Sequence, residues 1–178
     1  SAGGNQAMSI GTAINQSASG ASIHVGAGTY AEQLALNKAG LTLTGQAGAK
    51  LVVPDAAEVN GIAISANNVT VQGMEIAGPI NSPYYDYYAT TKPNISRGIA
   101  VGDGITGFTI QNNNIHDVRN GILIHGRNST GTVSNNRIEN TKSGISVQYT
   151  DATGISIAGN SEGSVGNEWG LNLHLNGN

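Results

Sequence analysis

The chain has 178 residues, a formal net charge of −3, and charged residues make up only 11 % of it. It contains no Cys, which excludes disulfides and thiolate metal sites, and it shows neither a basic stripe nor a long apolar run. Nucleic acid and a membrane span are therefore not expected. The 26 Gly and 21 Asn favour many sharp turns, because both residues tolerate positive φ angles. The simplest expectation is one domain over residues 1–178.

The first predicted element is a short helix over about residues 4–18. Ala7, Ile10, Ile14 and Ala18 follow helical spacing, which predicts an apolar stripe along one side. Such a helix would cover the open end of a repeat structure. Coils are then expected over about residues 21–178, with the first strands at 23–25, 34–36 and 41–43.

The central part of the chain repeats three short apolar phrases in the same order. Gly-apolar-x-apolar begins at Gly61, Gly98, Gly121, Gly144 and Gly170. A second phrase has apolar centres at Val71, Ile110, Val133 and Ile157, and a third at Ile76, Ile115 and Ile138. Alternation with polar residues indicates short strands, and a repeat that returns in the same order favours parallel stacking. The sequence thus predicts an all-β, parallel β-helix whose apolar columns point inward.

Asparagines also recur at one turn position of this repeat, as Asn113, Asn136 and Asn160. A ladder of inward-turned amides would satisfy turn polar groups that are otherwise buried. We interpret these asparagines as structural rather than catalytic.

One segment, about residues 78–97, breaks the repeat and lengthens one spacing to 37 residues. It gathers four tyrosines around one acid, and insertions of a solenoid map to loops on one face, frequently the binding face. Tyr suits stacking on sugar rings, although these side chains would equally fold onto the coil's own surface. Arg97 and Asp103 lie beside the segment and would bind an acidic or hydroxylated sugar. The predicted ligand-binding residues are Tyr84, Tyr85, Asp86, Tyr87, Tyr88 and Arg97.

The stretch IHVGAGTYAEQLALNKAGLTLTG, which begins at Ile23, resembles the opening of the pectate-lyase-like superfamily of right-handed parallel β-helix proteins. The resemblance covers essentially the whole chain. It implies a right-handed solenoid with an N-terminal capping helix. It leaves function open, because the superfamily holds lyases, esterases, hydrolases, epimerases, phage tailspikes and non-catalytic adhesin domains.

The resemblance also says what catalysis would require. Lyases of the superfamily use calcium-binding acids with an Arg or Lys base, hydrolases two or three Asp, and esterases a pair of Asp with an Arg. The acids of this chain do not stack in the predicted register. His116 falls one rung from Glu139, as an acid–base couple or as a solvated ion pair. The weak catalytic candidates are His116, Glu139, Asp103 and Arg97.

Two functional hypotheses follow. The favoured one is a non-catalytic adhesin-type domain, secreted or at the bacterial cell surface, that binds a polysaccharide or surface glycan through loops on one face. The alternative is part of a polysaccharide lyase or epimerase acting on an acidic polysaccharide. No metal site or cofactor is expected, with calcium only under the lyase hypothesis. The apolar phrase at Gly170 near the C-terminus suggests a bare edge, and hence a piece of a longer chain that associates end to end.

Overall fold

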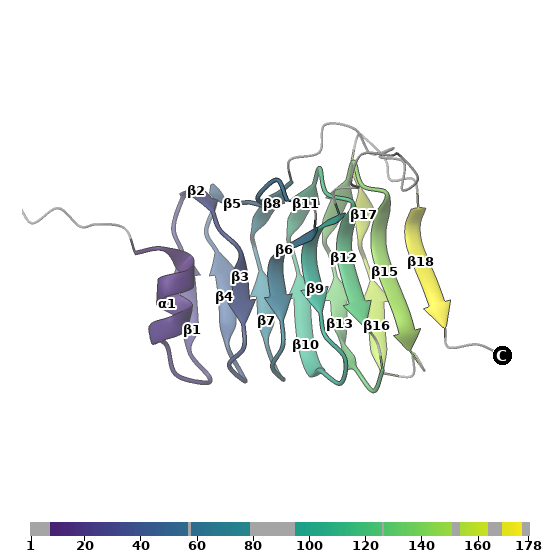
Figure 1. Ribbon diagram of the computed structural model, residues 1–178, viewed down its shortest axis with the longest axis horizontal. Coiled ribbons are helices and arrows are strands. Elements are labelled where there is room, and N and C mark those ends of the chain that lie inside the picture. The colour runs from purple at the N-terminus through teal and green to yellow at the C-terminus, as the bar shows by residue number, and fades with distance from the viewer. Residues whose placement is uncertain are drawn as a thin grey trace, which may run out of the picture.

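The computed structural model describes residues 8–56, 58–78, 95–125, 127–150, 154–163 and 169–175. These residues form a parallel β-solenoid of about 5 turns with one short helix at its N-terminal end (Figure 1). Three sheets run along the solenoid, and each contains six parallel strands contributed by successive turns of the chain. The predicted all-β parallel β-helix is confirmed.

Each turn of the chain supplies one strand to each sheet, in the order A, B, C. Sheet A contains β1 (Ser22–Val25), β4 (Thr42–Gly45), β7 (Thr70–Gln72), β10 (Thr106–Gln111), β13 (Thr130–Ser134) and β16 (Ile155–Ala158). Sheet B contains β2 (Gly28–Ala31), β5 (Ala49–Val52), β8 (Glu75–Ala77), β11 (Asn114–His116), β14 (Arg137–Glu139) and β17 (Ser161–Glu162). Sheet C contains β3 (Leu34–Leu36), β6 (Glu58–Ile64), β9 (Ile95–Val101), β12 (Asn120–His125), β15 (Ser143–Thr150) and β18 (Trp169–Leu175).

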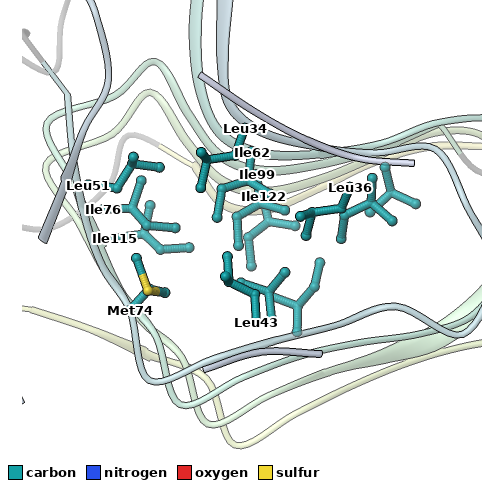
Figure 2. Close-up of a cluster of buried hydrophobic side chains, with 14 of the residues drawn as sticks. Leu34, Leu36, Leu43, Leu51, Ile62, Met74, Ile76, Ile99, Ile115 and Ile122 are labelled. Atoms are coloured by element: carbon teal, nitrogen blue, oxygen red, sulfur yellow. The ribbon is translucent and has the colours of Figure 1, made fainter. Parts of the chain in front are cut away.

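The core consists of aliphatic columns in which each side chain lies on the equivalent one of the next turn (Figure 2). The register places the predicted columns as expected, one in each sheet. They comprise Leu34, Ile62, Ile99, Ile122, Ile145 and Leu171 in sheet C, Leu43, Val71, Ile110, Val133 and Ile157 in sheet A, and Leu51, Ile76, Ile115 and Ile138 in sheet B.

The repeated glycine of the first phrase is required by a close approach between turns. A Cβ on Gly98 would lie 2.7 Å from the carbonyl oxygen of Gly121 and 2.6 Å from Cγ2 of Ile115. A Cβ on Gly121 would meet Gly144 and Ile138 in the same way, at 2.5 Å. Contacts this short leave no room for any side chain, which explains why the phrase returns with glycine at each turn.

The corner between sheets A and B combines a left-handed residue with the asparagine ladder. Asn112 and Asn135 have φ angles of 55° and 56°, which Asn tolerates better than most residues. In the ladder that follows, Nδ2 of Asn113 donates to Oδ1 of Asn136 at 3.0 Å, and Nδ2 of Asn136 donates to Oδ1 of Asn160 at 2.9 Å. The predicted structural role of these asparagines is thereby confirmed.

Helix α1 (Ile10–Gln16) covers the first turn with two buried side chains, Ile10 and Ile14. Ser9 caps its N-terminus, and the Glu32 carboxylate accepts hydrogen bonds from the first two N–H groups of the helix at 3.1 and 2.9 Å. Lys38 donates to the carbonyls at the other end, where the helix dipole favours a cation. The helix is shorter than the predicted span of about 4–18, of which residues 4–7 lie outside the described part.

Candidate functional site

A groove runs across the outer face of sheet C, over β6, β9 and β12. Its volume is about 330 Å³. Ala63, Ala100 and Leu123 form its floor, because they alternate with the buried core columns and therefore point outward. Polar side chains stand along it: Glu58, Asn60, Ser65, Arg97 and His125.

Arg97 is the central polar group of this groove. Its Nη2 lies 2.9 Å from Oε1 of Glu58, and its Nη1 donates to Oδ1 of Asn60 at 3.2 Å. Asn60 is its direct partner in the register, one turn before it. The Arg97 side chain is 16 % exposed, whereas that of Glu58 is 67 % exposed. The ion pair therefore orients the guanidinium. The exposed Glu58 carboxylate can also form hydrogen bonds with water in place of Arg97.

The Nε of Arg97 is shielded from solvent and has no hydrogen-bond partner among the described residues. A buried donor without an acceptor costs about 1–3 kcal/mol, and a ligand oxygen would recover this energy only if the atoms that shield Nε move aside. Guanidinium groups present a planar set of donors that suits carboxylate and hydroxyl oxygens. The groove thus offers a fixed donor group above a floor of small apolar side chains.

At the far side of the groove, His125 stands in a column with Gly102 and Gln148. Among the described residues that line the groove, Glu58 is the one carboxylate. Donors outnumber acidic groups here, an arrangement that can hold hydroxylated or anionic ligands.

A second cluster lies on the outer face of sheet B and contains the catalytic candidate His116. Its Nδ1 lies 2.6 Å from Oδ2 of Asp117, and its Nε2 lies 3.3 Å from Oε1 of Glu75. Lys50 reaches the same Glu75 oxygen at 2.8 Å, and Asn140 donates to Asp117 from the next turn. The four ionisable groups form one continuous network along the sheet.

The network lowers the pKa of Glu75 below its ordinary value of 4.5. The main cause is the hydrogen bond from Lys50, assisted by that from His116, and partial burial opposes both. Glu75 is therefore held as a carboxylate by two cationic or donor neighbours. Such a network stabilises the folded state, and none of its four ionisable groups lines the groove on sheet C.

The register places His116 beside Glu139, as predicted, but the two side chains form their described ion pairs with other residues. His116 contacts Glu75 and Asp117, while Oε2 of Glu139 lies 2.9 Å from Nη2 of Arg137. Comparison within one column had not indicated Glu75, because it lies two residues away on the neighbouring strand. Such diagonal neighbours are within reach of long side chains.

The remaining predicted residues fall in different places. Arg97 lies in the groove, on strand β9, whereas Asp103 lies exposed in the turn between β9 and β10. The tyrosine segment, with Tyr84, Tyr85, Asp86, Tyr87 and Tyr88, lies outside the described residues.

The groove residues Glu58 and Asn60 were not predicted. The repeat suggested a strand beginning at Gly61, whereas β6 begins three residues earlier, at Glu58. The signal available in the sequence was the shared column of Asn60, Arg97 and Asn120, since a polar residue precedes the glycine in all three turns.

The calcium considered under the lyase hypothesis finds no matching ligand set. Within the described ranges, no group of three or more His, Asp or Glu side chains is arranged to hold a metal ion. The described residues also include no helix that is long and apolar enough to cross a membrane.

Comparison with known proteins identifies the fold. No family model and no curated protein matches the sequence. Two crystal structures of pectin methylesterase match the structure, one of an aspartate-to-alanine mutant in complex with hexasaccharide IV (TM-score 0.51, 15 % identity) and one in complex with hexasaccharide VII (TM-score 0.57, 17 % identity). Each match covers 90 % of this chain and 64 % of the esterase chain. The chain is thus a parallel β-helix whose fold is similar to that of pectin methylesterase.

Proposed function

We propose that this chain is a non-catalytic, carbohydrate-binding β-helix domain that holds a glycan in the groove on sheet C. The observation that carries the proposal is the environment of Arg97, whose guanidinium lines the groove, is 16 % exposed and is oriented by Glu58 and Asn60. The small floor residues let a flat sugar ring approach the sheet. The matched esterase structures contain hexasaccharides, which supports a glycan as the ligand on a fold of this kind.

The location that suits this function is outside the cell, as a secreted or bacterial surface protein of adhesin type. Its partner would be a polysaccharide or a cell-surface glycan. The sparsely charged, cysteine-free composition agrees with such a setting.

The direct test is binding of hexasaccharides from pectin, with and without methyl esters, measured by calorimetry. Arg97→Met should weaken binding roughly tenfold to a hundredfold, because a hydrogen bond to a charged donor contributes about 1.5–3 kcal/mol. Arg137→Met is the matched control, since Arg137 also pairs with a glutamate at 2.9 Å but lies on sheet B. Equal losses in both variants, or no binding by the wild type to any glycan of a broad array, would contradict the proposal.

The tyrosine segment supplies a second test, which rests on the sequence alone. Replacing Tyr84, Tyr85, Tyr87 and Tyr88 with Ala should reduce glycan binding while leaving the melting temperature nearly unchanged, because stacking on sugar rings would be lost. A large drop in melting temperature would show that these side chains pack against the coil.

The competing hypothesis is that the chain is part of a polysaccharide lyase or epimerase. It is supported by the similarity of the fold to that of an enzyme, pectin methylesterase. Incubation with pectate, alginate and chondroitin, with and without calcium, distinguishes the two. Release of unsaturated or epimerised products, abolished by Arg97→Met or by Glu58→Gln, would replace the binding proposal with a catalytic one.

A further inference from the structure

The outer face of sheet A carries two columns of mostly polar, uncharged side chains. The first column joins Thr42, Thr70, Thr109 and Thr132 in direct register, with Ser22 and Ser156 at its ends. These residues point away from the core because they alternate with its buried column. The second column stands two residues further along each strand and contains Thr44, Gln72, Gln111 and Ser134 between His24 and Ala158.

None of the side chains in these two columns is an Asp, Glu, Lys or Arg, and none is a Phe, Tyr or Trp. Sheet B differs, since its outer face carries Lys50, Glu75, Arg137 and Glu139. A charged polymer would find no counter-charge among the columns of sheet A. A sugar would find no Phe, Tyr or Trp ring in these columns on which to stack.

The second column is locked by its own hydrogen bonds. Nε2 of Gln111 donates to Oε1 of Gln72 at 2.8 Å, and Nε2 of Gln72 donates to Oγ1 of Thr44 at 3.0 Å. Thr is stiff at χ1 because it is β-branched. The two columns therefore present a fixed array that loses little entropy when it binds a rigid partner.

The hydroxyls of the first column are available to solvent. Thr42, Thr70, Thr109 and Thr132 are all partly exposed, and none of these hydroxyls has a hydrogen-bond partner among the described residues. Each hydroxyl offers one donor and two acceptor sites. Water must satisfy these sites in solution.

The spacing of the hydroxyls is within about 0.3 Å of the distance between two oxygens that share one water in a tetrahedral network. Adjacent strands of a sheet lie about 4.8 Å apart, and the hydroxyls of one column repeat at that distance. In a tetrahedral network with O–H···O bonds of about 2.75 Å, two oxygens bonded to the same water lie about 4.5 Å apart. One water can thus bridge each successive pair of threonines, and the Thr methyl groups beside them help to confine this layer.

We propose that the outer face of sheet A is an ice-binding surface. Four successive strands of sheet A carry the threonines in direct register, so that contacts which are individually weak act together on one crystal plane, as linked binding sites do. Water molecules in the liquid have no fixed positions, whereas those in ice do. The fixed array should therefore bind ice in preference to liquid water. This binding surface is separate from the groove on sheet C.

The test is partition of the protein into a slowly growing ice hemisphere, together with thermal hysteresis of the freezing point. The wild type should be incorporated into the ice. Thr70→Lys/Thr109→Lys should be excluded to the level of a non-binding protein of similar size, because two long charged side chains prevent close contact with a flat plane. Thr29→Lys/Ser161→Lys is the matched control, since both residues are exposed on sheet B and the added charge is the same.

Exclusion of the wild type from ice, or equal incorporation of both double variants, would overturn the proposal. Circular dichroism verifies that the variants are folded, and the single variant Thr109→Lys provides a second readout if the double variant is unstable. Binding to crystalline cellulose that the sheet A substitutions abolish, without incorporation into ice, would assign the face to a neutral glycan instead. Arg97→Met should leave incorporation into ice unchanged, because Arg97 lies on sheet C. Failure of the ice-binding proposal can therefore be distinguished from failure of glycan binding in the groove.

Discussion

Asn136 is fully buried, and its side chain links three turns of the solenoid. Oδ1 accepts from the backbone N–H and the Nδ2 of Asn113, and Nδ2 donates to Asn160 and to the carbonyl of Ile110. Asn136→Ala would leave several buried polar groups without partners, so we expect a loss of about 3 kcal/mol or more in unfolding free energy, measured by urea denaturation. Asn37→Ala is the control, because Asn37 lies exposed in a turn, and its loss should stay below about 0.5 kcal/mol. Equal effects of the two substitutions would contradict the ladder's contribution.

Among single residues, Glu75 makes the unfolding free energy depend on pH. Its pKa is lowered in the folded state, chiefly by Lys50, so its contribution is present above the ordinary value of 4.5 and is lost as the pH falls through the folded pKa. Unfolding free energy of the wild type should therefore decrease below pH 4.5, and Glu75→Gln should flatten that part of the curve. The difference at pH 7 should stay below about 1 kcal/mol, because Glu75 is 34 % exposed. A steeper acid-side slope in Glu75→Gln would refute this assignment.

At the scale of elements, helix α1 depends on two side chains from the first turn, Glu32 at its N-terminus and Lys38 at its C-terminus. Lys38 donates to the carbonyls of Ile14 and Asn15 at 2.7 Å each, and also to that of Ser17. Lys38→Met removes these donors and keeps an apolar stem, so we expect a loss of about 1–3 kcal/mol and faster amide exchange in α1. Lys142→Met, at the opposite end, should leave exchange in α1 unchanged. Unchanged exchange in Lys38→Met as well would show that the burial of Ile10 and Ile14 holds the helix without this lysine.

The sequence predicted elements best where apolar alternation was strong. The columns through Ile62, Val71 and Ile76 follow from residues that recur at equivalent points, and the register confirms them. Strand β2 carried a weaker signal, because Gly28–Ala31 has one bulky side chain, Tyr30, and its partial burial comes from packing against the core. The groove was harder still to predict from the sequence. Glu58 and Arg97 are 39 positions apart, and neither local pattern specifies their contact.

At the scale of the whole molecule, the two ends of the solenoid differ. Helix α1 covers the first turn, while β18 is the last strand of sheet C (Figure 1). Leu171 and Leu173 of β18 are 51 % and 49 % exposed, although their register partners Ile145 and Val147 are buried. A cavity of about 240 Å³, lined in part by Ile138, Ile145 and Leu171, opens at this end. The core columns therefore continue to a surface at which apolar side chains meet solvent.

An exposed apolar strand edge favours pairing with another strand, so we predict end-to-end self-association of this chain. Light scattering should show an average mass that rises with protein concentration. Leu173→Lys should shift the distribution toward the monomer, because a charge cannot be buried without a partner when a second molecule covers β18. Thr29→Lys adds the same charge at the opposite end of the solenoid, on β2, and should leave the mass distribution unchanged. A wild type that stays monomeric at high concentration would show that the exposure of Leu171 and Leu173 is tolerated without a partner chain.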